Sequence, residues 1–576
     1  MDADADTDPF GSVELLQGLS APRRQRLIEQ ANRVRYRAGE WLFREGDSAD
    51  CAYIVQAGRI EIVSEGTQRE VLRTIKRGGI VGELALLRRT ARSASARAIR
   101  DCELLELSRE DFEQMILEDN RFALSLCRLM SAQLAEHRTP ATNQAPPRTV
   151  AIIALDDDLL VDEAADRLAQ ALASAGETAI LRADGARDLA DHAALIDRAE
   201  ANSRWVILAA TGGPADPWTR ACLAEADRIV ALSRGRPNGQ WLEHPTALHG
   251  CELLILGRSV PESMLDVILP HAVQTLADES ATRRSLALSA RRLNGRAVGI
   301  VFSGGGARAF AHLGVVEELR AAGVQIDRVA GASMGALVAA VLAREMDDHA
   351  IYETFRHNFV EQHPSRDYTL PVFSLIRGRK TLHLLEETFG RTRIEQLPLR
   401  FFCVSADLNG RSLVVHRIGL LRDALFASLA IPGVFPPIPT QEGRLLVDGG
   451  VLDNLPVETM ARDGEGPVIA VDVTGSLAWR PRQTGRPSLW RARARALISG
   501  QHGELPSLAE TILLTLTVGG RDTVLAARRH ADLVLTPAVE RSGLLEWGQL
   551  PKMREAGRES VRRLLESDPE ALKRFL

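Results

Sequence analysis

A serine between two glycines is the residue with the clearest chemical potential in this chain. Gly331-Ala332-Ser333-Met334-Gly335 follows a strand-like run at 327–330 and precedes an apolar, helix-like run at 336–342. A G-x-S-x-G sequence between a strand and a helix is the pattern of a nucleophile elbow, in which a sharp turn exposes the serine hydroxyl. The pattern predicts Ser333 as a nucleophile, and a corner of small packed residues is the alternative.

A glycine-rich loop lies upstream of this serine. The buried-strand pattern at 298–302 is followed by Gly304, Gly305 and Gly306 and then by a helical stripe that ends near Gly323. Backbone N–H groups at such a helix start form an anion site, which would suit the oxyanion of an ester-hydrolysis intermediate. The same loop also fits a dinucleotide fingerprint, with Asp327 at about the right distance beyond it. The Ser333 motif favours hydrolysis, because hydride transfer has no use for a serine elbow.

A serine nucleophile needs a base, and an aspartate motif lies far downstream. Asp448-Gly449-Gly450 follows the apolar run 445–447. Asp-Gly is first of all a turn signal, so the motif alone is more often structural than catalytic. The histidines offer no standard partner, since His312 falls inside the predicted helix after the glycine loop and His416 lies in a strand-like run.

These three ordered motifs together resemble patatin-like phospholipases. The segment 428–437, Ser-Leu-Ala-Ile-Pro-Gly-Val-Phe-Pro-Pro, also fits that family, and the resemblance covers residues 296–475. It implies lipid acyl hydrolysis by a Ser–Asp dyad without histidine. Carried over residue by residue, Ser333 is the nucleophile, Asp448 the base, and Gly304, Gly305 and Gly306 form the oxyanion hole. Ala309 replaces a usual glycine and is expected to fit if its φ is negative.

A second cluster of chemical interest lies in the amino-terminal part of the chain. Residues 81–87, Val-Gly-Glu-Leu-Ala-Leu-Leu, and then 92–95, Arg-Ser-Ala-Ser, resemble the phosphate-binding cassette of cyclic-nucleotide-binding domains. The resemblance implies that Glu83 takes the ribose hydroxyl and Arg92 the cyclic phosphate. The implied binding residues are Gly82, Glu83, Leu84, Ala85, Arg92 and Ser93. A domain that has kept this fold and lost its ligand is the alternative.

The elements that must position these residues indicate a multidomain chain. Short strands punctuated by glycines predict a β-roll with helices over 1–138, followed by a polar, proline-rich linker at 139–148. Continuous apolar runs predict an α/β segment with a covered parallel sheet over 149–290; it has no phosphate-binding loop motif, and its role is unassigned. An α/β patatin-like hydrolase core is expected over 296–475, with a C-terminal extension over 476–576. This order resembles the neuropathy target esterase family, although one sensor is counted here and no membrane anchor.

The composition narrows the classes of partner. The net charge of −5 gives no reason to expect nucleic acid binding, and no metal site or catalytic cofactor is predicted. The acidic start has no apolar run, and no stretch is apolar enough to span a bilayer, so the expectation is a cytoplasmic protein whose membrane contact is peripheral. Residues 473–503 carry arginines and no acidic residue, which predicts contact with anionic lipid or, equally, a solvated loop. Oligomeric state is not readable from the sequence.

The sequence thus favours a serine esterase that acts on phospholipids or lysophospholipids, with cAMP or cGMP as an allosteric ligand. The alternative is a cyclic-nucleotide-binding signalling module whose hydrolase domain is a non-catalytic scaffold.

Overall fold

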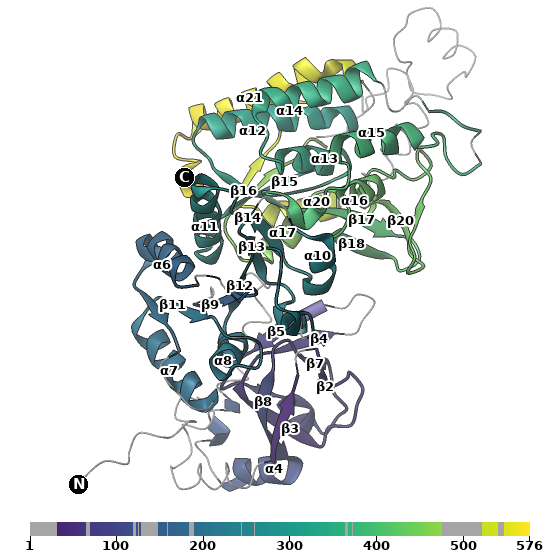
Figure 1. Cartoon of the computed structure of the whole chain (residues 1–576). Helices are drawn as coiled ribbons and strands as arrows, with labels where there is room; N and C mark the ends of the chain where they lie inside the picture. The colour runs from purple at the N-terminus through teal and green to yellow at the C-terminus, as the bar shows by residue number, and fades with distance from the viewer. Residues whose placement is uncertain are drawn as a thin grey trace, which may run out of the picture. The chain divides into compact units, whose positions relative to one another are not determined.

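The computed structural model divides the chain into two compact units, residues Met1–Asn294 and Gly295–Leu576 (Figure 1). Of the 576 residues, it describes 32–37, 39–64, 70–118, 122–124, 126–127, 148–157, 159, 161–183, 189–243, 245–257, 260–362, 367–370, 372–474, 521–539 and 546–576. Residues 139–147 of the predicted linker at 139–148, and most of the arginine-rich stretch at 473–503, lie outside these residues.

The first part of unit 1 is a β-roll made of two four-stranded antiparallel sheets, in the orders β1-β8-β3-β6 and β2-β7-β4-β5. Its strands are β1 (Asn32–Tyr36), β2 (Trp41–Phe43), β3 (Cys51–Ala57), β4 (Ile60–Ser64), β5 (Glu70–Ile75), β6 (Ile80–Val81), β7 (Ser95–Ala98) and β8 (Cys102–Ser108). The short helix α3 (Glu83–Arg88) follows β6 directly, and α4 (Arg109–Glu118) follows β8. The glycine-punctuated strands of the sequence therefore form the expected roll.

The second part of unit 1 is a six-stranded sheet in the order β10-β11-β9-β12-β13-β14, and all its neighbouring pairs are parallel. Its strands are β9 (Thr149–Ala154), β10 (Thr178–Leu181), β11 (Trp205–Ala210), β12 (Arg228–Ser233), β13 (Glu252–Ile255) and β14 (Ala272–Thr275). Helices α6 (Val161–Leu172) and α11 (Glu279–Leu293) pack on one face. Helices α7 (Leu189–Asn202), α8 (Pro217–Glu225), α9 (Gly239–Glu243) and α10 (Glu262–Ile268) pack on the other. Burial on both faces explains the continuous apolar runs.

Unit 2 is built on one mixed sheet in the order β19-β20-β17-β16-β15-β21-β22, with β18 also paired to β17. Its strands are β15 (Val298–Phe302), β16 (Ile326–Ala332), β17 (Arg400–Asp407), β18 (Ser412–His416), β19 (Ile438–Pro439), β20 (Leu445–Asp448), β21 (Val468–Val471) and β22 (Leu533–Leu535). The strands from β17 through β22 along this order are parallel, whereas β18, β19 and β20 add antiparallel pairings. Strand β17 thus joins the parallel part of the sheet to its antiparallel part.

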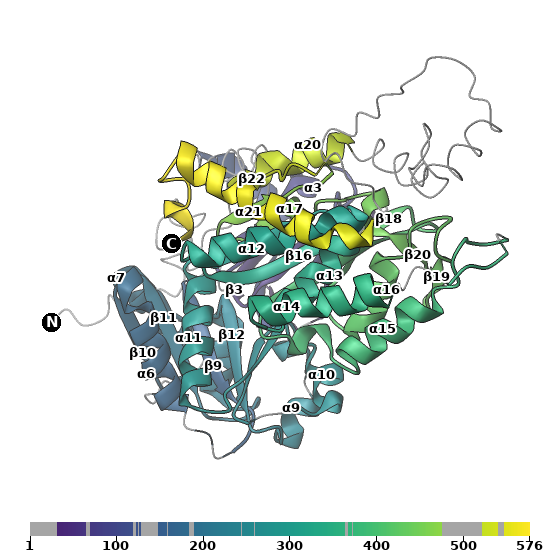
Figure 2. The same cartoon turned by 90° about the horizontal axis from the view of Figure 1, so that it is seen from above.

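Helices cover both faces of this sheet (Figures 1 and 2). One apolar cluster joins the sheet to α12 (Ala311–Ala321), α13 (Ser333–Leu342), α14 (Asp348–Phe355), α15 (Arg379–Phe389), α16 (Leu421–Ser428) and α21 (Leu550–Ser567). The opposite face packs against α17 (Val457–Ala461) and α20 (Arg521–His530). Helices α12 and α21 lie in backbone contact, because a Cβ at Gly314 would stand 1.8 Å from the carbonyl oxygen of Arg554. The two units together confirm the predicted fold class of a β-roll with helices followed by α/β domains.

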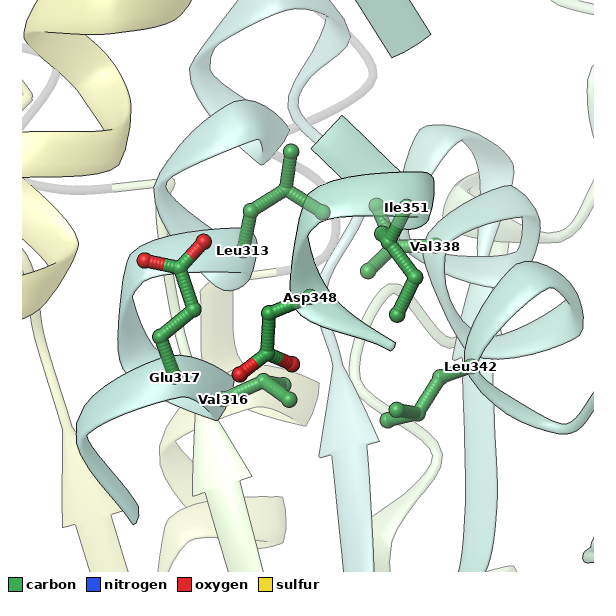
Figure 3. Close-up of a pocket in the computed structure, with 7 residues that line it drawn as sticks. All are labelled: Leu313, Val316, Glu317, Val338, Leu342, Asp348 and Ile351. Carbon is green, nitrogen blue, oxygen red and sulfur yellow. The ribbon is translucent and has the colours of Figure 1, made fainter. Parts of the chain in front are cut away.

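A small hollow between α12, α13 and α14 is lined mainly by apolar side chains (Figure 3). Its two carboxylates, Glu317 and Asp348, are ion-paired with Arg554 and Arg558 and with Arg320. None of the predicted site residues lines it. We therefore treat it as a packing gap and not as a reaction site. None of the helices within the described residues has the length and apolar character needed to cross a bilayer.

Candidate active site

Ser333 lies at a sharp strand-to-helix turn. Strand β16 ends at Ala332, helix α13 begins at Ser333, and the φ of Ser333 is 53°, in the left-handed region that few side-chain-bearing residues adopt. A Cβ at Gly335 would stand 2.5 Å from the carbonyl oxygen of Phe302, and a Cβ at Gly331 would stand 2.6 Å from the carbonyl carbon of Gly335. Both glycines are thus required for α13 to pack this closely on the strand ends. The geometry is that of a nucleophile elbow.

Strand β17 brings Asp448 to this turn across more than a hundred residues of sequence. Val404 of β17 pairs with Ala332, the residue before the serine, and the next residue, Ser405, pairs with Asp448 at the end of β20. The backbone N–H of Asp448 also donates to the carbonyl oxygen of Ala430 at 2.9 Å. Adjacent register positions on one strand therefore fix the serine and the aspartate beside each other.

The two side chains are hydrogen-bonded, with the Ser333 hydroxyl donating to the Asp448 carboxylate. Both residues are buried, at 7% and 5% exposure. Burial raises the pKa of Asp448 from its ordinary value to about 6, against the lowering effect of hydrogen bonds from Ser333 and from the Gly450 N–H at 2.8 Å. A carboxylate with this pKa is a stronger base than an exposed aspartate and is still ionised at pH 7.

The glycine loop follows β15 and faces the serine. A Cβ at Gly304 would stand 2.9 Å from the Cβ of Ser333, so only glycine allows this approach. The Gly304 N–H donates to the carbonyl oxygen of Asn454 at 3.3 Å. Gly305 caps and Gly306 begins a 3-10 helix, Gly306–Phe310, that leads into α12, and the N–H groups of both glycines have no hydrogen-bond partner within the described part of the chain. Of the three predicted oxyanion residues, these two have the more available donors. Ala309 has no positive φ and fits its position.

Two further residues position the site, and the motif search gave neither of them a role. The Ser428 hydroxyl accepts a hydrogen bond from the Ser333 backbone N–H at 3.1 Å, and Ser428 is fully buried. Asn454 donates its side-chain amide to the carbonyl oxygen of Gly304 at 3.3 Å, which completes a reciprocal pair with the loop. A signal was present in both cases, since Ser428 begins the family-like segment 428–437 and Asn454 closely follows the Asp-Gly-Gly turn.

The two histidines considered from the sequence bond elsewhere. His312 is fully buried in α12, its Nε2 lies 2.9 Å from the carbonyl oxygen of Ser303, and burial lowers its pKa to about 4. The His416 Nε2 lies 2.7 Å from the Ser405 hydroxyl, and burial lowers the His416 pKa to about 4 as well. Both rings are therefore neutral at pH 7, and neither of these bonds reaches Ser333.

The sensor cassette in unit 1 also comes together. Gly82, with φ 88°, begins α3, and Glu83 at the first position of the helix is 1% exposed. Leu84 and Ala85 follow on the same helix, and the exposed Ser93 follows Arg92. The Glu83 carboxylate lies 3.5 Å from the Arg73 guanidinium.

Arg92 is the most constrained of these residues. Its guanidinium donates to the carbonyl oxygens of Gly82 at 2.9 Å and of Cys51 at 2.7 Å, and it stacks 4.1 Å from the ring centre of Phe43. A Cβ at Gly82 would stand 2.3 Å from Arg92 Nη1, so this glycine is needed to seat the arginine. The Arg92 Nε–H is buried without a protein partner in the described structure. That N–H group is therefore a buried hydrogen-bond donor that lacks an acceptor there.

Among the described residues, no group of three or more histidine, cysteine, aspartate or glutamate side chains is arranged to hold a metal ion.

The fold and these sites define a patatin-like phospholipase, a carboxylic ester hydrolase, preceded by a cyclic-nucleotide-binding domain. The patatin-like phospholipase family matches residues 300–461, and the cyclic nucleotide-binding domain family matches residues 33–119. The first match contains both the serine elbow and the Asp-Gly-Gly turn, and the second contains the whole cassette.

The chain belongs to the NTE family. It is 31% identical to an uncharacterized NTE family protein of Mycobacterium tuberculosis over 98% of this chain and 97% of the relative. A lysophospholipase of Emericella nidulans is 27% identical over 91% of this chain and 41% of the relative. Patatin-like phospholipase domain-containing protein 6 of Mus musculus is 28% identical over 76% of this chain and 37% of that protein. This chain thus spans well under half of the fungal and mouse relatives.

Proposed function

We propose that the chain is a serine esterase that hydrolyses the carboxylic ester bonds of lysophospholipids and related phospholipids through a Ser333–Asp448 dyad. The observation that carries the proposal is the hydrogen bond between these two buried side chains at a nucleophile elbow. The names of the fungal relatives, which are lysophospholipases, support the substrate class.

The reaction would proceed in two steps. Asp448 accepts the hydroxyl proton as Ser333 Oγ attacks the ester carbonyl carbon, and collapse of the tetrahedral intermediate breaks the C–O bond to the alcohol, which leaves with that proton. Water then attacks the acyl-serine, gives a proton to Asp448 and releases the fatty acid as Ser333 regains its hydrogen. The N–H groups of the glycine loop would hold the oxyanion in both steps, with those of Gly305 and Gly306 as the principal donors.

Positioning compensates for the modest basicity of a carboxylate. The Ser428 hydroxyl bonds the backbone of the nucleophile, and the β17 register places the base. Asn454 ties the oxyanion loop to the segment that carries Asp448. A site held in this way needs little rearrangement when charge develops on the substrate oxygen, which is where preorganised donors contribute most.

We also propose that a cyclic nucleotide, cAMP or cGMP, binds the α3 cassette and regulates the esterase. The buried Arg92 Nε–H, which lacks a protein acceptor, supports an anionic ligand at this point. Glu83 at the start of the same helix supports a ligand hydroxyl nearby. Because Arg92 is already bonded to two backbone carbonyls, the ligand has to add to this arrangement or replace part of it.

The test is a substrate panel for the purified full chain and for Ser333→Ala. Lysophosphatidylcholine, lysophosphatidylethanolamine, diacyl phosphatidylcholine and a short-chain nitrophenyl ester would be compared by release of fatty acid or nitrophenol. We expect hydrolysis of a lysophospholipid by the wild type and none above background by Ser333→Ala. A wild-type chain that hydrolyses none of these esters and still binds a cyclic nucleotide would support the non-catalytic signalling module instead.

A further inference from the structure

We propose that a loop beside the active site inserts its apolar tip into a phospholipid surface. The tip consists of the four side chains of Tyr368, Leu370, Val372 and Phe373, which precede helix α15. In Figures 1 and 2 the segment before α15 projects from the body of unit 2. The tip does not include the dyad residues, and in the sequence it is distinct from the arginine-rich stretch at 473–503.

The exposure of this tip is far above that of comparable residues. Tyr368 is 72% exposed, Leu370 82%, Val372 74% and Phe373 84%. Other large apolar side chains of unit 2 that the structure describes as exposed are 38–49% accessible, except for the terminal Leu576. Single exposed apolar residues are ordinary, but four within six positions are not. The cluster therefore indicates a surface that meets an apolar environment.

The loop is a hairpin that is stabilised by its own hydrogen bonds. Tyr368 and Ile376 form an antiparallel bridge, and the Thr369 N–H donates to the carbonyl oxygen of Leu375 at 3.1 Å. The Asp367 carboxylate accepts from the backbone N–H groups of Arg379 and Lys380 at the start of α15. These bonds hold the apolar side chains outward, where no part of the protein that the structure describes covers them.

The base of the hairpin is attached to the segment that positions the dyad. The N–H groups of Leu375 and Ile376 donate to the carbonyl oxygens of Gly433 and Val434, each at 2.9 Å. That segment begins at Ser428, which bonds the nucleophile's backbone, and includes Ala430, whose carbonyl accepts from the backbone of Asp448. The hairpin base and the backbones of both dyad residues are thus hydrogen-bonded to the same short segment, residues 428–434.

The charge around the tip selects a phospholipid surface over another protein copy. Arg377, Arg379 and Lys380 are exposed at the base of the hairpin, and the sequence from 368 to 385 contains no acidic residue. The apolar tip matches the acyl region of a bilayer, and these three cationic side chains match its phosphates. A second copy of this chain that docked here through its own tip would bring the same three cations close to these three, and the like charges would repel.

The experiment measures vesicle binding without turnover. Full-length Ser333→Ala would be compared with the same chain carrying Leu370→Ser and Phe373→Ser, by flotation with vesicles of equal parts phosphatidylcholine and phosphatidylglycerol. Leu525→Ser, a change at a 46% exposed leucine on α20, is the matched control. We expect the double variant to bind the vesicles at least about tenfold more weakly than its parent and the Leu525→Ser control to bind as its parent does. Vesicle binding by the parent should weaken as the salt concentration is raised.

A second measurement separates lipid access from chemistry. With Ser333 restored, the double variant should hydrolyse a water-soluble nitrophenyl ester as the wild type does and vesicle-borne lysophospholipid more slowly by the same factor as its loss of binding. Unchanged vesicle binding in the double variant overturns the proposal, as does a wild-type dimer that becomes monomeric in the double variant without loss of vesicle binding. Because flotation requires no turnover, its result stands apart from failure of the esterase proposal.

Discussion

The hydrolase site of unit 2 and the sensor cassette of unit 1 were both recognised from short motifs, yet their polar groups are arranged differently. In the hydrolase site, Ser333 and Asp448 bond to each other, and two loop N–H groups have no protein partner in the described structure. In the cassette, Arg92 already donates to two backbone carbonyls and stacks on Phe43. The first site thus has unpartnered backbone donors beside the proposed dyad, whereas in the second the arginine is already bonded within the protein.

The difference shows how strongly a change at each site should affect the protein. Removing a group from the proposed dyad should lower the rate of ester hydrolysis while leaving most other contacts in place. Removing Arg92 removes three internal contacts together with the proposed ligand contact, so its effects on binding and on stability must be measured separately.

The largest effect is expected at the dyad. Ser333→Ala and Asp448→Asn should each lower kcat for ester hydrolysis by about 10⁴-fold or more, because nucleophile and base act as one unit. Steady-state kinetics on the substrate that the panel identifies would measure this loss. Near-wild-type turnover in either purified variant would remove the dyad from the account.

Thermal unfolding provides the control for Asp448→Asn. The pKa of Asp448 is raised to about 6 by burial, so the folded state favours the neutral carboxyl, and the stability that protonation contributes is lost as pH rises through about 6. Asparagine cannot ionise, so the variant should be more stable than the wild type at pH 8, by up to about 3 kcal/mol, and similar at pH 4. A variant that is less stable at pH 8 would mean that its lost activity reflects misfolding.

A smaller loss is expected at the oxyanion loop. A Cβ at Gly305 would stand 2.8 Å from Val473 Cγ2, so Gly305→Val should displace the loop and lower kcat by about 10²–10³-fold, the usual effect of losing an oxyanion donor. Gly548→Val is the matched control in the same unit, since its Cβ would meet no atom within 4 Å. Equal kinetics for the two variants would argue against an oxyanion role for Gly305.

The smallest effect is expected from the sensor. A cyclic nucleotide at 100 times its Kd should stabilise the β-roll by about 2.7 kcal/mol and change esterase activity severalfold, in line with a coupling energy of about 1–3 kcal/mol. Arg92→Ala should lose both responses, whereas Arg97→Ala, a change at the arginine paired with Glu61, should keep them. Thermal shift and hydrolysis would be measured together with cAMP and with cGMP.

Two results would refine the comparison between the sites. A thermal shift with unchanged kinetics would leave nucleotide binding in place and reject allosteric control. No shift with either nucleotide would mean that the cassette has kept its fold and lost its ligand, as its closed arrangement around Arg92 allows.

Local sequence patterns were enough to predict the fold class and the serine elbow. Apolar runs such as 298–302 predicted buried strands, and the glycines around Ser333 predicted a tight turn, because both depend on neighbouring residues alone. The partnership with Asp448 came from family resemblance. Its physical cause is the register of β17, which pairs adjacent residues with Ala332 and Asp448 and cannot be read from either motif.

Other features depended on tertiary contacts that a linear pattern does not contain. Gly82 was predicted as a cassette residue from the resemblance alone, and its close approach to the Arg92 guanidinium could not be read from the sequence. The positioning contacts of Ser428 and Asn454 cross the chain between distant segments. The apolar hairpin tip was not predicted either, because a run of apolar residues gives no sign of being exposed. The arginine-rich prediction at 473–503 falls almost wholly outside the described residues and remains a prediction.

The central claim is that Asp448 activates Ser333, and the pH dependence of active-site labelling tests it most directly. The rate at which a fluorophosphonate labels the full chain would be followed from pH 4 to pH 9, with the labelled residue identified by mass spectrometry. Because only ionised Asp448 can accept the proton, the rate should rise with pH and reach half its maximum near pH 6. Asp453→Asn, at a second aspartate whose pKa burial raises to about 6, should leave this midpoint in place, whereas Asp448→Asn should label slowly at every pH. Labelling of a residue other than Ser333, or an Asp448→Asn variant that labels as fast as the wild type, would contradict the account.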